Sequence, residues 1–197
     1  METKIEKLFS LLDNWRKLPA YQLERRADIF FALYLPEIFK HKFAIKIDYK
    51  QIIPEFPIKM ESKNLSNKID YVVVSKENKT VYLIELKTEM TSVITPQIEL
   101  MKRAQGKGTK GLIKSVEQIA KVSKSEKYKE LESRLETTGM TDKKIIWEEP
   151  KIVYLLPKPD KKLKDFTQIT FKEIAGILKE KDELAKRFVE SLEVWIK

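Results

Sequence analysis

The sequence predicts an α/β protein in which helices flank a mixed sheet. A hairpin is expected at residues 69–88, where two runs rich in Val, Ile, Tyr and Leu surround the polar turn 76–79. The run Ile152–Leu156 is apolar without alternation, which is typical of a central strand covered on both faces. Helical periodicity lies before, between and after these strands, and a helix between them is the crossover that a parallel neighbour requires.

Composition limits the classes of protein. The chain has 197 residues, 42% of them hydrophobic, which predicts one domain, 1–197, with a real core. Its parts are N-terminal helices (1–40), a core sheet with its crossover helix (44–156), and C-terminal helices (165–197). Cysteine is absent and histidine occurs once, which excludes a disulfide framework and multi-histidine metal sites.

Charge and hydropathy point to a partner and a compartment. The net charge of +9 favours a polyanionic partner, although a lysine-rich background explains it equally well. No apolar run approaches the roughly 18 residues of a membrane span, and the charged N-terminus is unlike a signal peptide. We therefore expect a cytoplasmic protein without a membrane partner.

The N-terminal third predicts two helices and two extended segments. Apolar residues at helical spacing predict helices at 4–16 and 21–35, and Pro36 should end the second because the residue before a proline avoids helical angles. The alternation in Ala44–Tyr49 predicts a strand. Ile52–Lys59 continues extended, but its two prolines limit it to a sheet edge or a bulge.

The region after the hairpin predicts helices separated by a glycine-rich loop. A helix should begin at Thr95-Pro96 and stop at Gly106. The segment GKGTKG at 106–111 lacks the glycine spacing of a P-loop, so we predict a mobile basic loop. A helix then starts near Leu112, and it either continues or restarts before ending near Gly139.

Two C-terminal helices are predicted from their caps. Thr170 and Glu173 form a capping box that opens a helix to about Lys179, and Asp182 caps the last helix. We interpret both as packing elements or a dimer surface.

The hairpin is expected to gather ionisable side chains at a strand end. A turn centred between Glu77 and Asn78 sets Asp70 opposite Glu85, and directly opposed residues share one face of the sheet. Lys87 follows two residues after Glu85 and shares its face, whereas Leu86 points to the other. Two carboxylates and an ammonium there have the composition of a Mg²⁺ site beside a proton-handling lysine.

Asp70 followed by Glu85-Leu86-Lys87 resembles the motif of the PD-(D/E)XK, or restriction-endonuclease-like, nuclease superfamily. The resemblance covers roughly residues 24–156 and implies an αβββαβ core, here with extra C-terminal helices. It implies a metal-dependent nuclease, a hydrolase that cuts phosphodiester bonds, of DNA in preference to RNA. Asp70, Glu85 and the carbonyl of Leu86 would hold Mg²⁺ or Mn²⁺, and Lys87 would orient or deprotonate the attacking water, or hold the phosphate.

The same resemblance suggests a further acid from the helix before the sheet. Glu24 is the first candidate metal ligand and Asp28 the second. The alternative for Glu24 is an ion pair with Arg25 or a nearby lysine on a solvated face. Glu55 is a further acid, but we favour an exposed strand residue for it.

Cations near the motif suit phosphate contacts, which position nucleic acid without reading its sequence. A polar loop at 61–68 should lie near the mouth of the site, and a denser cluster follows in and beside the glycine-rich segment. The candidates are Lys68, Lys102, Arg103, Lys107, Lys110 and Lys114. Solvation alone explains such a cluster equally well.

Other functions stay open at this point. Asp70, Glu85 and Lys87 are also compatible with an ion-pair ladder on an exposed sheet face. The chain would then be a non-catalytic nucleic-acid-binding or partner-binding protein on the same fold. A homodimer fits an endonuclease, because cutting both strands of a duplex usually needs two sites, but no residue demands it.

Overall fold

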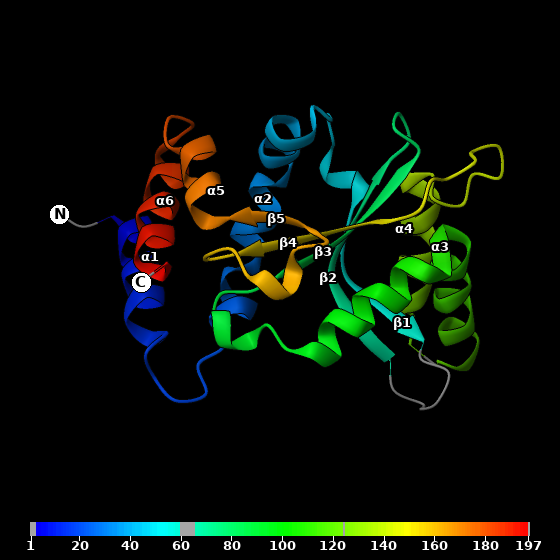
Figure 1. Ribbon diagram of the computed structural model, residues 1–197, viewed down its shortest axis with the longest axis horizontal. Coiled ribbons are helices and arrows are strands. Elements are labelled where there is room, and N and C mark those ends of the chain that lie inside the picture. The colour runs from blue at the N-terminus through cyan, green and yellow to red at the C-terminus, as the bar shows by residue number, and fades with distance from the viewer. Residues whose placement is uncertain (1–2, 60–65, 124, 197) are drawn as a thin grey trace. The chain divides into compact units, whose positions relative to one another are not determined.

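The computed structural model describes residues 3–59, 66–123 and 125–196 (Figure 1). The α-helices are α1 (Lys4–Trp15), α2 (Leu23–Phe43), α3 (Thr95–Val122), α4 (Lys127–Thr138), α5 (Phe171–Leu178) and α6 (Glu183–Trp195). The strands are β1 (Ile52–Lys59), β2 (Ser66–Ser75), β3 (Thr80–Leu86), β4 (Lys151–Leu156) and β5 (Thr167–Thr170). Short 3₁₀ helices are η1 (Tyr49–Gln51), η2 (Met90–Ser92) and η3 (Lys161–Leu163). Most of the predicted polar loop 61–68 lies outside the described residues.

The strands form an open sheet in the order β1-β2-β3-β4-β5. β2 pairs antiparallel with both β1 and β3. The N–H of Glu148 donates to the carbonyl of Lys79 at 2.9 Å, and the N–H of Lys87 donates to the carbonyl of Leu155 at 2.8 Å. Residue numbers increase in the same direction along these two paired segments, so β4 runs parallel to β3. The sheet is therefore mixed and flanked by helices, which confirms the predicted α/β class.

The chain folds as two compact units. Unit 1 comprises Met1–Lys46, Leu86–Val93 and Tyr154–Lys197, and unit 2 comprises Ile47–Glu85 and Ile94–Val153. The N-terminal and C-terminal helices thus belong to the same unit, although most of the chain separates them. The single domain expected from length stays a prediction.

Aromatic side chains form the core of unit 1. Phe188 of α6 lies edge-on to Phe31 of α2, with ring centroids 5.1 Å apart, and stacks on Tyr34 at 5.9 Å. Phe31 also lies 5.2 Å from Phe171 of α5, and Phe9 of α1 lies 6.1 Å from Phe188. Each of these side chains is almost fully buried. Figure 1 shows α6 between its neighbours α1 and α5.

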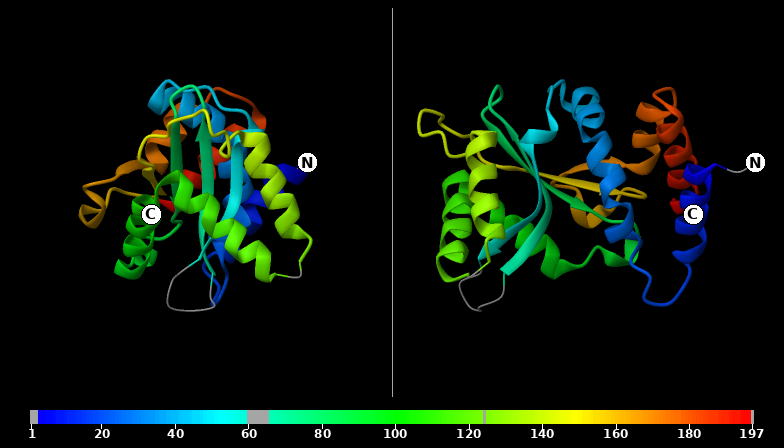
Figure 2. Two further views of the ribbon diagram at one scale, coloured as in Figure 1. Left: turned by 90° about the vertical axis from the view of Figure 1, so that its right-hand side faces the viewer. Right: turned by 180° about the vertical axis from the view of Figure 1, so that it is seen from behind.

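Unit 2 is built on the β2–β3 hairpin with β1 at the sheet edge. Helix α3 packs against β1 and β2, and α4 runs beside α3 (Figure 2). The guanidinium of Arg134 on α4 donates to the carbonyl of Ile52 at 3.3 Å, and the amide of Gln51 donates to the carbonyl of Val74 at 2.8 Å. These contacts fix the start of β1.

The predicted hairpin register is confirmed. Val74 pairs with Val81 and Ser75 with Thr80, as expected for a turn centred between Glu77 and Asn78. The hairpin strands are buried from Tyr71 to Ser75 and from Thr80 onward. β1 is an edge strand, as its prolines predicted, and β4 is buried on both faces.

The predicted end of the second helix was wrong, because α2 continues through Pro36 to Phe43. A proline inside a helix removes one hydrogen bond and bends the axis. Ile38 and Phe39, beyond the proline, are completely buried, and their burial offsets this cost. The helix ends where Ala44 adopts the left-handed conformation, with φ 56°.

The predicted strand Ala44–Tyr49 does not form. The carboxylate of Asp48 accepts the N–H of Lys50 at 2.8 Å and caps η1, so the segment ends in a turn. Ile45 and Ile47 are buried. Their alternation therefore reflects burial of two side chains and not pairing with another strand.

The predicted basic loop at 106–111 was also wrong, since α3 runs through it with a kink. Gly108 takes φ 63° and ψ 174°, a conformation between two helical halves that favours glycine. Thr109 and Leu112 are buried just beyond the kink, so the helix regains its core contact at once. The predicted end at Gly139 is confirmed, because α4 closes there with φ 74°.

The C-terminal caps are confirmed. Thr170 and Glu173 form the capping box of α5, and the carboxylate of Asp182 accepts the N–H of Ala185 at the start of α6. Strand β5 was missed, since its four residues carry no clear alternation. No helix in the described ranges combines the length and hydropathy needed to cross a membrane.

Candidate functional site

The end of β3 buries both an acid and an amine. Glu85 and Leu86 are completely buried, and Lys87 is 4% exposed. Burying a charged group costs free energy unless it is paired and hydrogen-bonded. An ion-pair ladder on an exposed sheet face therefore does not describe Glu85 and Lys87.

Asp70 belongs to the same hairpin as Glu85. Tyr71 pairs with Ile84, and extending this antiparallel register by one residue sets Asp70 opposite Glu85. Directly opposed side chains share one face of a sheet, with Cβ atoms about 5 Å apart. Asp70 is half-buried, so it is the more accessible of the two carboxylates.

A side chain that the sequence analysis missed contacts Glu85. The side-chain amide of Gln97 donates a hydrogen bond to Oε1 of Glu85. Gln97 lies in the first turn of α3, directly after the Thr95-Pro96 start that the sequence does indicate. A hydrogen bond from an amide reduces the cost of burying the carboxylate and fixes its orientation.

Glu24 reaches the lysine of the motif. Its Oε1 lies 3.6 Å from Nζ of Lys87, and its side chain is 32% exposed. Glu24 lies in the first turn of α2, where the helix dipole favours an acid. The backbone of Lys87 is held by its hydrogen bond to Leu155. The structure thus pairs the acid expected from the preceding helix with Lys87.

The two lesser acid candidates lie in different settings. Asp28, one turn after Glu24, is half-buried, and its Oδ1 accepts the backbone N–H of Ile29 at 2.7 Å. Glu55 is exposed, as expected, and lies 2.5 Å from the ammonium of Lys68. Glu55 also has a φ of 50°, a local irregularity in the edge strand. Lys68 is thus engaged by a neighbouring acid.

The residues present fit a small metal site but not a three-acid cluster. In the ranges that the structure describes, no three Asp, Glu or His side chains gather as a group able to hold a metal ion. Mg²⁺ needs one or two carboxylates, because water and phosphate oxygens complete its octahedral shell. Asp70 opposite Glu85 supplies such a pair.

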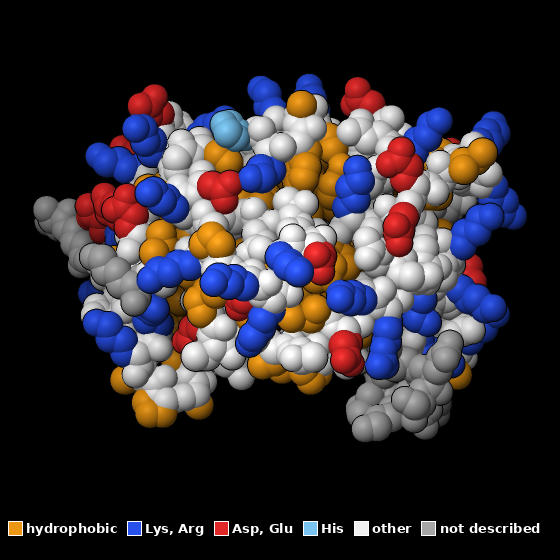
Figure 3. All heavy atoms as spheres, in the orientation of Figure 1, with side chains coloured by type: hydrophobic (Ala, Val, Ile, Leu, Met, Phe, Trp, Pro, Cys, Tyr) orange, Lys and Arg blue, Asp and Glu red, His pale blue; other side chains and the backbone are white. Residues whose placement is uncertain are grey.

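The remaining predicted nucleic-acid contacts lie on α3 and not in a loop. They are Lys102, Arg103, Lys107, Lys110 and Lys114, all exposed except the half-buried Lys107. Arg103 lies 3.7 Å from Glu99, one turn earlier in the helix. Figure 3 shows lysine and arginine side chains spread over one face of the molecule among acidic ones.

No family model, curated protein or solved structure matches this chain.

Proposed function

We propose that this protein is a metal-dependent nuclease that hydrolyses phosphodiester bonds, with DNA as the favoured substrate. The observation that carries the proposal is the burial of Glu85 and Lys87 on either side of Leu86, at the end of β3. Buried ionisable groups are costly for stability, and clusters of them are typical of functional sites. Asp70 opposite Glu85, and Glu24 beside Lys87, add to this support.

The order of the elements agrees with the proposal. Helix α2 is followed by β1, β2 and β3, then by α3 and α4, and then by β4. This is the αβββαβ order of a restriction-endonuclease-like core, and β5, α5 and α6 would be additions to it. We therefore propose that core for this chain, with the motif acids on β2 and β3.

The acids would hold the metal ion. Asp70, Glu85 and the backbone carbonyl of Leu86 would bind Mg²⁺ or Mn²⁺, which supplies Lewis acidity and neutralises charge on the phosphate. Gln97 donates to one oxygen of Glu85 and so orients this carboxylate. The half-buried Asp70 presents its carboxylate nearer to solvent.

Lys87 would act on the phosphate or on the attacking water. Its ammonium can donate hydrogen bonds to a phosphate oxygen and stabilise the negative charge that grows as water attacks phosphorus. The carboxylate of Glu24, 3.6 Å away, pairs with the ammonium of Lys87 and orients it. Glu24 is then a positioning residue for Lys87.

Cleavage assays test the proposal. Plasmid and single-stranded DNA should be degraded with Mg²⁺ or Mn²⁺ and remain intact with EDTA. Asp70→Ala, Glu85→Ala and Lys87→Ala should each lower the rate by about 100-fold or more while circular dichroism shows a retained fold. Glu55→Ala is the matched control, because Glu55 is an exposed acid on the neighbouring strand. Unchanged cleavage in all three motif variants would refute the assignment.

Binding without cleavage is the second candidate function, and the exposed cations of α3 favour it. Phosphate contacts release counterions, so the logarithm of the affinity should fall linearly with the logarithm of the salt concentration. Salt-dependent DNA binding without any metal-dependent cleavage would support this candidate over the nuclease.

A further inference from the structure

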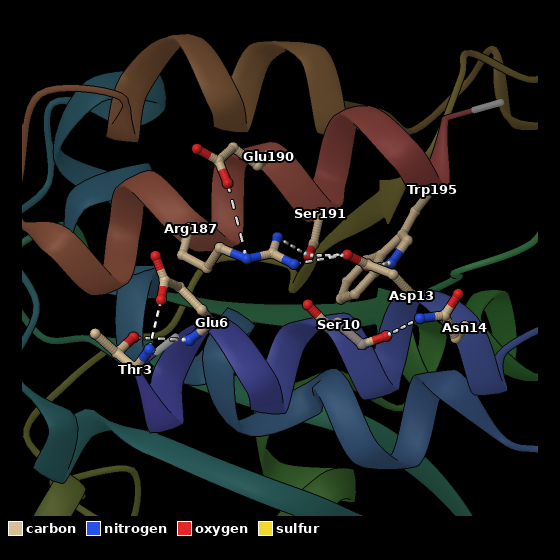
Figure 4. Close-up of polar contacts among 9 residues, drawn as sticks. All are labelled: Thr3, Glu6, Ser10, Asp13, Asn14, Arg187, Glu190, Ser191 and Trp195. Carbon is tan, nitrogen blue, oxygen red and sulfur yellow. Dashed lines mark hydrogen bonds and ion pairs between the residues drawn. The ribbon is translucent and has the colours of Figure 1, made fainter. Parts of the chain in front are cut away.

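The inner face of α1 is fixed to α6 by a partly buried polar cluster. Figure 4 shows Arg187, Ser191 and Trp195 of α6 pointing toward Asp13 of α1. The carboxylate of Asp13 accepts hydrogen bonds from Trp195 at 2.8 Å and from Arg187 and Ser191 at 3.0 Å each. Phe9, on the same inner side, packs into the aromatic core. The orientation of α1 about its own axis is therefore set.

This orientation leaves a second apolar row on the outer face of α1. Leu8 is 45% exposed, Leu11 37% and Trp15 46%, and Leu18 just after the helix is 55% exposed. Their spacings of three and four residues place the helical members on one face. Large apolar side chains gathered on a surface mark interaction sites, whereas isolated ones need no explanation. We call Leu8, Leu11, Trp15 and Leu18 the outer seam.

Within the described residues 3–18, the charged side chains that adjoin the outer seam are basic. Lys4 and Lys7 lie one turn before Leu8 and Leu11, and Lys17 adjoins Leu18; all three are exposed. The acids of α1 are engaged elsewhere: Glu6 caps the helix through Thr3, and Asp13 binds α6. Among the described residues, Lys4, Lys7 and Lys17 form no ion pair. The rim of the outer seam is therefore basic.

We propose that the outer seam docks an amphipathic helix of a partner protein whose apolar row is flanked by acidic side chains. A row spaced by three and four residues is the pattern by which one helix packs against another. A second copy of this chain would bring the same lysines together, and like charges across an interface disfavour binding. A lipid surface would require a broad apolar face, but the inner half of α1 is already packed in the core.

Trp15 provides a direct readout of docking on the intact 197-residue chain. Trp195 is 2% exposed and Trp147 is half-buried, so a partner on the outer seam should shift the emission of Trp15 to shorter wavelength. The probe is a synthetic helical peptide of about two heptads with Leu at the a and d positions and Glu at e and g. A second peptide carries Lys in place of Glu. At low to moderate salt, we expect the Glu peptide to bind about tenfold more tightly than the Lys peptide. High salt should remove this preference, because it screens the charges.

Variants keep the proposal open to refutation. Leu11→Gln should abolish binding of the Glu peptide, and Lys7→Glu should weaken it and favour the Lys peptide. Ile146→Gln, at a residue of unit 2 that is 86% exposed, should change the affinity for neither peptide. Equal affinity for both peptides, or no shift with either, would overturn the proposal. A shift in Trp15 emission with phosphatidylserine vesicles in place of the peptides would also overturn it. So would a dimer, detected by sedimentation, that dissociates in Leu11→Gln. The assay needs no cleavage, so its result is independent of the nuclease assignment.

Discussion

The ammonium of Lys87 lies 3.6 Å from the carboxylate of Glu24. Glu24 belongs to the first turn of α2, and Lys87 directly follows β3, so the contact joins segments far apart in the sequence. Lys87 is 4% exposed, and burying its ammonium costs free energy that a paired carboxylate offsets. This pair links the first helix of the proposed core to its motif.

Removal of the charge on Glu24 should destabilise the protein. Glu24→Gln keeps the shape of the side chain but leaves the buried ammonium of Lys87 with a neutral partner. We expect the free energy of unfolding in urea to fall by about 1–3 kcal/mol. Glu55→Gln removes the exposed pair with Lys68 and should cost no more than about 1 kcal/mol. Equal losses in the two variants would show that burial of Lys87 does not strengthen its pairing.

Gln97 should matter to both stability and cleavage. Gln97→Leu removes the amide that donates to the completely buried Glu85, so we expect a loss of about 1–3 kcal/mol in the free energy of unfolding. Under the proposed function, cleavage should also become slower, because the carboxylate loses its orientation. Gln118→Leu, at a half-buried position of the same helix, is the control. If both variants behaved alike, the hydrogen bond to Glu85 would have no special role.

Local patterns in the sequence predicted the hairpin and the caps well. The polar turn alone gave the register in which Val74 pairs with Val81, because side chains alternate along a strand and one face is buried. The capping box of Thr170 and Glu173 was equally readable, since it depends on a spacing within one turn.

Features set by tertiary contacts could not be predicted in the same way. Pro36 suggested a helix end, but burial of Ile38 and Phe39 outweighed that local preference. For the candidate site, the motif residues were readable from the hairpin. The contact of Gln97 with Glu85 depends on how α3 leaves the sheet, which no periodicity in the sequence records.

Two glycines of α3 should respond in opposite ways to substitution by alanine. Gly108 has φ 63°, so Gly108→Ala should cost about 1–2 kcal/mol of stability through backbone strain. Gly106 is helical, with open space around an added Cβ, so Gly106→Ala should stabilise by about 0.5–1 kcal/mol. Thermal unfolding of both variants measures the difference. A gain in stability for Gly108→Ala would contradict the kink at that residue.

Glu173 should make stability depend on pH in the acid range. Burial raises the pKa of its carboxyl, but the hydrogen bonds from Lys42 and Thr170 together lower the pKa by a larger amount. The net pKa of Glu173 therefore lies below its ordinary value of 4.5. A carboxyl with a lowered pKa contributes its stabilisation fully above the ordinary value and loses it as pH falls through the folded value. Urea unfolding of the wild type and Glu173→Gln, from about pH 7 to pH 3, should show a difference that shrinks below about pH 4.5. Lys42→Met removes the ammonium 2.7 Å away, so adding Glu173→Gln to it should have a smaller effect than in the wild type. A difference that grew on acidification would mean that the protonated form of Glu173 is favoured in the fold.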